Sequence, residues 1–169
     1  QAHAMDSHVR RALARARVGL VGRLGGQSTP VRPIVTKAIE ALGKLNRSRD
    51  LQWRLRIDGE PMFDGEAGDL TEILGNLLDN AGKWASGIVS ITAATKNGQL
   101  RFVIEDDGPG MPHHAIDSIE RGKRWDNEVD GTGFGLAIVR DLVAAYGGML
   151  AFESADLGGL RVVMTFPAR

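Results

Sequence analysis

The sequence contains no cysteine, which excludes disulfide bonds and thiol chemistry. It also lacks a net charge, with 21 Lys and Arg against 21 Asp and Glu, so no overall field favours nucleic acid as a partner. No run approaches the ~18 apolar residues of a membrane span, and the first residues carry no signal-peptide pattern. What remains is a chain of 169 residues, 43% hydrophobic, which is enough for one well-buried core.

The beginning of the chain differs from the rest. Residues 1–7 are set aside as a possible cloning remnant, and residues 8–24 predict a basic helix with one apolar stripe. No partner helix follows it closely, so we expect it to pack against a segment outside this sequence. Residues 25–30, GGQSTP, predict a linker or turn. We therefore expect one folded domain over 25–169.

Hydrophobic periodicity divides this domain into helices and strands. Helices are predicted at 31–50, 67–84 and 134–148, and strands at 51–57, 87–95, 99–106, 149–155 and 160–167. Lys96, Asn97 and Gly98 predict a hairpin turn. Because the strands pair as hairpins while helices come between them, the pattern predicts an α+β fold. We expect a two-layer α/β sandwich, with helices on one face of a mostly antiparallel mixed sheet.

The second helix has a polar stripe beside its apolar face. Asn76, Asn80 and Lys83 follow i, i+4, i+7 spacing and therefore line up along the edge of that face, whereas Asp79 and Gly82 are expected on the water side. A single asparagine there is most simply a solvated helix edge. Three aligned polar groups that border a core favour the wall of a cleft.

Two glycine-rich segments follow. In EDDGPGMP, Asp107 comes at the end of a strand, and Gly108 and Gly110 allow the backbone to turn close to a ligand, although this pattern alone is usually an ordinary turn. In DGTGFGLAIV, a GxGxG segment runs directly into a helix, whose free N–H groups suit a phosphate. It is no Rossmann fingerprint, because no βαβ unit surrounds it, and no P-loop sequence occurs.

In this order and spacing, the three segments together resemble the ATP-binding domain of sensor histidine kinases. That domain belongs to the wider gyrase, Hsp90, histidine kinase and MutL superfamily. The resemblance covers about residues 28–167. The local sequences GNLLDNAGKW, EDDGPGMP and ERGKRW are most similar to PhoQ-type kinases. It implies a Bergerat-type fold that binds ATP and Mg²⁺.

The resemblance implies a role for each residue of the helix stripe. Asn76 and Asn80 would be Mg²⁺ ligands, since neutral oxygen donors suit an ion that keeps several waters and bridges phosphates. Lys83 would be a point charge on the phosphates. Trp84 stands where the family usually has Tyr or His, so ring packing is retained and a hydroxyl contact is not.

For the glycine-rich segments, the resemblance implies contacts with the base and the phosphates. Asp107 would accept a hydrogen bond from the adenine 6-amino group, which selects ATP over GTP, and Gly108 and Gly110 would let the base approach. A lid that wraps the phosphates would be hinged by Gly131, Thr132, Gly133 and Gly135. Arg121 and Arg124 are weaker candidates for phosphate contacts, with a solvated charge cluster equally compatible.

The superfamily includes both kinases and ATPases, and one position separates them. ATPases carry a glutamate four residues before the second asparagine as general base for water, whereas this chain has Asn76 there, which favours a kinase. No histidine of the chain is followed by an acidic residue, so the phosphoacceptor is absent, and residues 1–24 would end a dimerisation helix pair.

The resemblance implies the catalytic part of a two-component sensor kinase, which donates the γ-phosphate to a histidine on a separate dimerisation domain. The expected partners are this dimerisation domain, homodimeric in the full protein, and a response regulator, with the fragment itself monomeric. The expected place is the cytoplasmic side of a bacterial inner membrane. An ATP-sensing interaction module without phosphotransfer stays open as the alternative.

Overall fold

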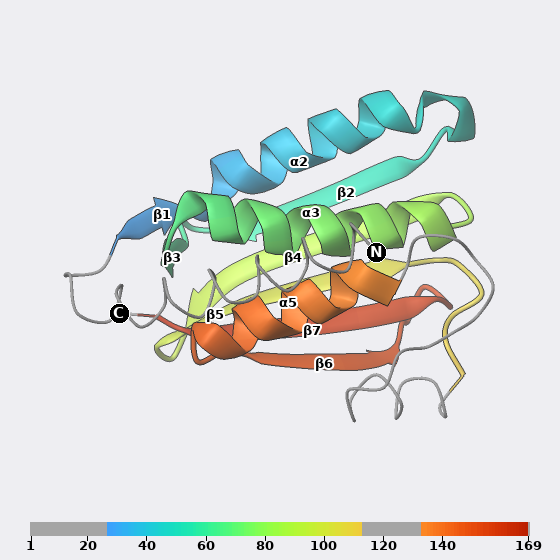
Figure 1. Cartoon of the computed structure of the whole chain (residues 1–169). Helices are drawn as coiled ribbons and strands as arrows, with labels where there is room; N and C mark the ends of the chain where they lie inside the picture. Colours follow the sequence, from blue (N-terminus) through green and yellow to red (C-terminus); the bar gives the residue numbers. More distant parts are fainter. Residues whose placement is uncertain (1–26, 113–132, 169) are drawn as a thin grey trace, which may run out of the picture.

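The computed structural model describes residues 27–112 and 133–168 (Figure 1). Its elements, in chain order, are β1 (Ser28–Pro30), α2 (Val31–Leu45), the 3₁₀ turn η1 (Arg47–Arg49), β2 (Gln52–Asp58), β3 (Met62–Asp64), α3 (Ala67–Trp84), β4 (Ile88–Lys96), β5 (Gln99–Asp106), α5 (Gly133–Ala145), β6 (Met149–Ser154) and β7 (Leu160–Pro167). The predicted helix at 8–24, and four predicted site residues, Arg121, Arg124, Gly131 and Thr132, lie outside the described residues.

Five of the strands form one mixed sheet in the order β2-β4-β5-β7-β6. β2 and β4 are parallel because α3 crosses over between them, and the other three pairings are antiparallel. The predicted hairpin turn joins β4 to β5, with Asn97 and Gly98 both at positive φ (53° and 71°). Figure 1 shows α2, α3 and α5 on the same face of this sheet. The predicted two-layer sandwich is therefore confirmed.

The core lies between the helices and the sheet. On β4, alternate residues are buried and point toward the helices: Val89, Ile91 and Ala93. α3 is the central helix and packs against both α2 and α5, so it is buried on more than one side. The predicted water-facing position of Gly82 is therefore wrong: a Cβ there would lie 3.4 Å from the Trp53 ring.

Both outer helices are shorter than predicted. α2 ends at Leu45, because Asn46 leaves the helical conformation (φ −103°, ψ 23°), and its side-chain amide caps the Leu42 carbonyl at 2.9 Å. The predicted helix extended to residue 50 and so included η1. α5 ends at Ala145 instead of 148, because Gly147 turns the backbone to a φ of +67°.

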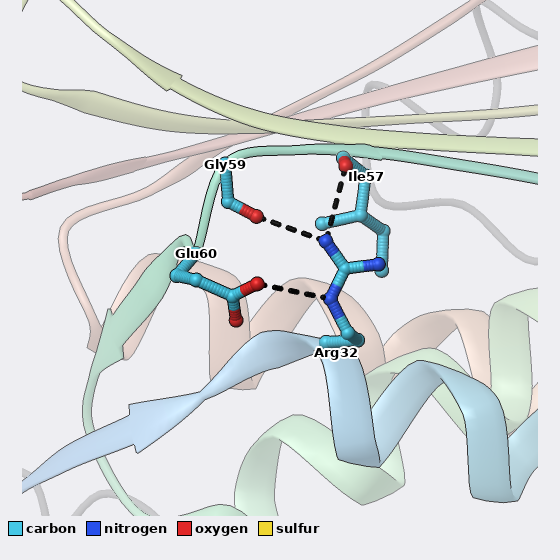
Figure 2. A network of polar contacts seen from close by, with 4 residues as sticks. All are labelled: Arg32, Ile57, Gly59 and Glu60. Atoms are coloured by element: carbon cyan, nitrogen blue, oxygen red, sulfur yellow. Dashed lines mark hydrogen bonds and ion pairs between the residues drawn. The ribbon is translucent and has the colours of Figure 1, made fainter.

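A small second sheet was not predicted. β1 lies within the predicted linker at 25–30 and pairs antiparallel with β3. Each of these strands has three residues, too few for a periodic pattern. Arg32 at the start of α2 holds the turn that leads into β3 (Figure 2). Its guanidinium donates to the Gly59 carbonyl at 2.9 Å and the Ile57 carbonyl at 3.3 Å, and pairs with Glu60 at 3.3 Å. The pair is exposed, so its contribution is mainly geometric.

Candidate functional site

The polar stripe of α3 faces the start of α5. The Asn76 side-chain amide donates to the Glu72 carbonyl at 2.8 Å, which leaves its Oδ1 atom pointing away from that bond. A Cβ atom on Gly135 would lie only 2.6 Å from this oxygen. Two residues from separate sequence motifs are thus neighbours, and the glycine leaves the carboxamide oxygen uncovered.

Asn80 lies one turn further along α3. It is half-buried and has no hydrogen-bond partner among the described residues. Asn76 and Asn80 therefore offer two neutral oxygen donors on one helix face, a set that fits Mg²⁺. Within residues 27–112 and 133–168, no group of three or more His, Asp or Glu could hold a metal. An ion on the two asparagines would complete its coordination with phosphate oxygens and water.

Lys83 is not isolated on this face. Its ammonium group lies 2.7 Å from the carboxylate of Asp79, one turn earlier on α3. The pair is about half exposed, so it contributes little to stability. A phosphate that binds Lys83 has to compete with Asp79 for the ammonium group.

Asp107, directly after β5, binds the backbone of the turn between α3 and β4. Its Oδ1 atom accepts three backbone N–H groups: Ser86 at 2.8 Å, Gly87 at 2.9 Å and Ile88 at 2.9 Å. Burial raises the pKa of the Asp107 carboxyl, but the three N–H donors outweigh that effect, and the pKa ends below its ordinary value. The carboxylate is therefore held in place as an anion.

Asp106, its neighbour, lies on the opposite face of β5 and is only 3% exposed. Its Oδ1 accepts the Gly108 N–H at 2.9 Å and the Leu160 N–H at 3.4 Å, while Oδ2 has no partner among the described residues. Burial raises the pKa of this carboxyl, more than the two N–H bonds lower it, and the charge of Asp107 adds to the rise.

Sequence reasoning did not select Asp106, although a signal was present. Phe102, Ile104 and Asp106 alternate along β5, so all three face the core. A carboxylate in a core-facing position is expensive unless it has partners or a function.

The two glycines after Asp106 are required for different reasons, close packing at Gly108 and backbone conformation at Gly110. A Cβ on Gly108 would run into the carbonyl oxygen of Trp84, at the end of α3. Gly110 has a φ of +73° and faces the carbonyl of Gly159 in the turn between β6 and β7. The loop after β5 is thus held between α3 and this turn.

The predicted residues therefore form two groups on the C-terminal half of α3. One joins Asn76 to Gly135 at the start of α5. The other joins Trp84 to the loop after β5, which includes Asp107 and Gly108. The arrangement places oxygen donors at one end of the helix face and a buried carboxylate near the other.

Comparison with known proteins identifies the fold family. Residues 65–169 match the family described as histidine kinase-, DNA gyrase B-, and HSP90-like ATPase. The chain belongs to this family. The predicted similarity to PhoQ-type histidine kinases is confirmed by relatives of that name.

Two curated relatives are sensor kinases. The chain is 50% identical over 100 residues to the sensor protein kinase CarS of Pseudomonas aeruginosa, which covers 59% of this chain and 22% of CarS. It is 36% identical over 138 residues to the virulence sensor histidine kinase PhoQ of Salmonella typhimurium, covering 81% of this chain and 28% of PhoQ. The chain thus spans about a quarter of the relatives it matches.

Solved structures of histidine kinases have a similar fold. The mycobacterial sensor histidine kinase MprB has a TM-score of 0.73 at 26% identity, over 85% of this chain and 98% of that chain. Full-length ShkA in complex with AMPPNP has a TM-score of 0.74 at 26% identity, over 99% of this chain and 36% of that chain. No described helix of this chain is long and apolar enough to cross a membrane.

Proposed function

We propose that this domain binds Mg-ATP along α3 and donates the γ-phosphate to a histidine on a separate dimerisation domain, as the catalytic part of a two-component sensor kinase. The observation that carries the proposal is Asn76, an amide whose oxygen faces Gly135 at the start of α5. This amide can bind a metal but cannot take a proton from water. The sensor kinase relatives and the ATP analogue in the ShkA complex support the same function.

In this proposal Asn76 and Asn80 hold Mg²⁺, which when bound neutralises charge on the phosphate oxygens. Lys83 leaves Asp79 to contact a phosphate, and Trp84 packs beside the nucleotide. Gly133 and Gly135 begin α5, whose N-terminal N–H groups face the phosphates. Arg121, Arg124, Gly131 and Thr132 stay as predicted phosphate contacts from the lid.

Base recognition needs an acceptor for the adenine 6-amino group. Asp107 is the residue predicted from the sequence, but its Oδ1 already accepts three N–H groups. Asp106 uses only Oδ1 within the described part of the chain, and its other oxygen remains as an acceptor. We therefore propose that Asp106 recognises adenine, while Asp107 shapes the loop, with Gly108 and Gly110, so that the base can approach.

The transfer itself requires a partner. A ring nitrogen of the acceptor histidine forms a bond to the γ-phosphorus, the bond to the β–γ bridging oxygen breaks, ADP leaves, and the imidazole proton goes to solvent. This partner would be the chain's own dimerisation domain, to which residues 1–24 would lead, and a response regulator would then receive the phosphate. The parent would be a bacterial inner-membrane sensor with this domain, residues 25–169, on the cytoplasmic side, and the isolated fragment would be monomeric.

Radiolabelled ATP tests the proposal. The fragment alone should remain unlabelled, whereas an added dimerisation domain should be labelled in proportion to its concentration, because tethering no longer supplies proximity. Asn80→Ala should abolish the labelling, and Thr71→Ala, an exposed position near the start of the same helix, should leave it unchanged. ATP binding without any labelled acceptor would instead support an ATP-sensing module.

A further inference from the structure

Arg49 reaches the C-terminal end of α3 from the 3₁₀ turn η1. Nη1 donates to the Gly82 carbonyl at 2.5 Å and to the Lys83 carbonyl at 3.0 Å, and Nη2 donates to the Ala85 carbonyl at 2.5 Å. The last carbonyls of a helix have no partner inside the helix. One guanidinium therefore supplies hydrogen bonds for three of them, at the end of the helix dipole that favours a cation.

The end of α3 needs such support. Gly82 stands in its last turn, and glycine weakens a helix by roughly 0.5–1 kcal/mol relative to alanine. The Trp53 ring packs against this position, 3.4 Å from where a Cβ would lie. An external cap from Arg49 offsets part of the weakness that the glycine brings to the helix end.

Asp107 binds the same turn from the other side. Arg49 holds carbonyls up to Ala85, and Asp107 accepts the N–H groups from Ser86 to Ile88. Between them, the carbonyl of Trp84 packs against Gly108 in the loop after Asp106. A cation and an anion thus fix the backbone on the two sides of the end of α3, next to the loop that follows β5.

We propose that Arg49 is a positioning residue for the nucleotide site, an inference that rests on the proposed function. It makes no contact with the nucleotide. Its guanidinium fixes the end of α3, and with it Lys83 and Trp84, relative to Asp106 and the loop that follows it. Small displacements of binding groups reduce binding and transfer strongly, so this cap governs affinity as well as local stability.

The planar fork of arginine is part of the inference. The two terminal nitrogens reach carbonyls three residues apart in the same turn, those of Gly82 and Ala85, whereas the ammonium of a lysine is a single point charge. Arg49→Lys should therefore retain only part of the positioning effect. Arg49→Met, which keeps the apolar stem, should retain none of it. Arg47→Met is the matched control, because Arg47 is an exposed arginine of the same turn.

The experiment combines two measurements on the whole chain at a temperature where every variant is folded. Calorimetry gives the affinity for Mg-ATP, and amide hydrogen exchange reports on the three N–H groups bound by Asp107. In Arg49→Met we expect affinity to fall by roughly tenfold or more. The amides of Ser86, Gly87 and Ile88 should exchange faster, while those of the β5 core keep their protection. Arg49→Lys should be intermediate, and Arg47→Met should match the wild type.

Each outcome decides between alternatives. Unchanged affinity in a folded Arg49→Met protein would show that Arg49 stabilises the fold only, and the proposed function would stand. Unchanged exchange at the three amides would overturn the positioning role whether or not ATP binds. Failure of the wild type to bind ATP would reject the proposed function and the nucleotide role of Arg49 together. If Arg49→Met does not fold, Arg49→Lys carries the same comparison.

Discussion

The Oδ1 atom of Asn76 lies 2.6 Å from the position that a Cβ on Gly135 would occupy. The side chain of Asn76 cannot turn away freely, because its amide donates to the Glu72 carbonyl. The central helix and the start of α5 are thus fitted to each other at the predicted metal ligand. A methyl group would fill the space into which this oxygen points.

Gly135→Ala should therefore reduce Mg-ATP affinity by roughly tenfold or more, because Asn76 has to move from its position. Its effect on the free energy of unfolding should stay within ~1 kcal/mol, since alanine favours the helix. Gly75→Ala is the control on α3, where nothing lies within 4 Å of the added Cβ. It should stabilise the protein by ~0.5–1 kcal/mol and leave affinity unchanged. Equal affinities in the two variants, measured by calorimetry, would contradict the metal role.

Asp106→Asn should remove the preference for adenine. The amide oxygen is needed at the Oδ1 position to accept the N–H groups of Gly108 and Leu160, so the NH₂ group takes the place of Oδ2. A donor then faces the 6-amino group of adenine, and ATP affinity should fall about tenfold to a hundredfold. GTP, which presents a carbonyl there, should lose nothing or gain.

Asp107→Asn is the matched comparison. All three N–H groups converge on one oxygen, which an asparagine can still supply, so ATP affinity should fall less than in Asp106→Asn. Competition between ATP and GTP for each variant gives the answer. A larger loss of ATP preference in Asp107→Asn would return base recognition to Asp107.

The two adjacent carboxylates should respond to pH in opposite directions. Asp107 has a lowered pKa, so it stabilises the fold above the ordinary value of 3.8, and this contribution is lost as pH falls through the lowered pKa. Asp106 has a raised pKa, so its contribution is fully present below 3.8 and is lost as pH rises through the raised value. Denaturant unfolding of wild type and both asparagine variants, from neutral pH to about pH 3, measures these differences.

Relative to wild type, Asp107→Asn should be least stable at neutral pH, and the difference should shrink in acid. Asp106→Asn should be at least as stable as wild type at neutral pH, because the buried charge is gone, and should lose that advantage in acid. A destabilised Asp106→Asn at neutral pH would mean that the charged form makes stronger hydrogen bonds than its burial costs.

Tyr146 supports the opposite end of α3. Its hydroxyl donates to Asp69 Oδ2 at 2.6 Å and accepts the Glu66 N–H at 3.3 Å. Tyr146→Phe leaves the Asp69 carboxylate, which is 5% exposed, without this donor, and should lower the free energy of unfolding by ~1–3 kcal/mol. Because Asp69 lies about 16 Å from Asn80 along the helix axis, ATP affinity of the folded protein should not change. Thermal unfolding and calorimetry on one preparation separate the two effects.

Elements with a long hydrophobic period were predicted well from the sequence. The 18-residue helix α3 has the predicted bounds, 67–84, because its apolar period extends over five turns. The three-residue strands β1 and β3 could not be found this way. Gly82 was misplaced because burial on the flanks of α3 depends on which helices pack beside it.

The candidate site was partly predictable for the same reason. Asn76, Asn80 and Gly135 belong to local patterns, and the structure brings Asn76 and Gly135 together. Asp106 and Asp107 are adjacent in sequence, but at the end of β5 their side chains bind different backbone groups, so only the register of the strand distinguishes them. Arg49 contacts carbonyls 33 to 36 residues away, and no local pattern indicates such a bond.

ATP turnover by the isolated chain should be negligible, although binding requires Mg²⁺. Hydrolysis needs a group that takes a proton from the attacking water, and the residue at the base position, Asn76, is an amide. Asp79, a carboxylate three residues further along α3, is paired with Lys83 at 2.7 Å. Release of inorganic phosphate at saturating ATP should therefore stay close to the background without protein, and a chelator should abolish binding. Turnover at the rate of a dedicated ATPase would show that another carboxylate serves as base.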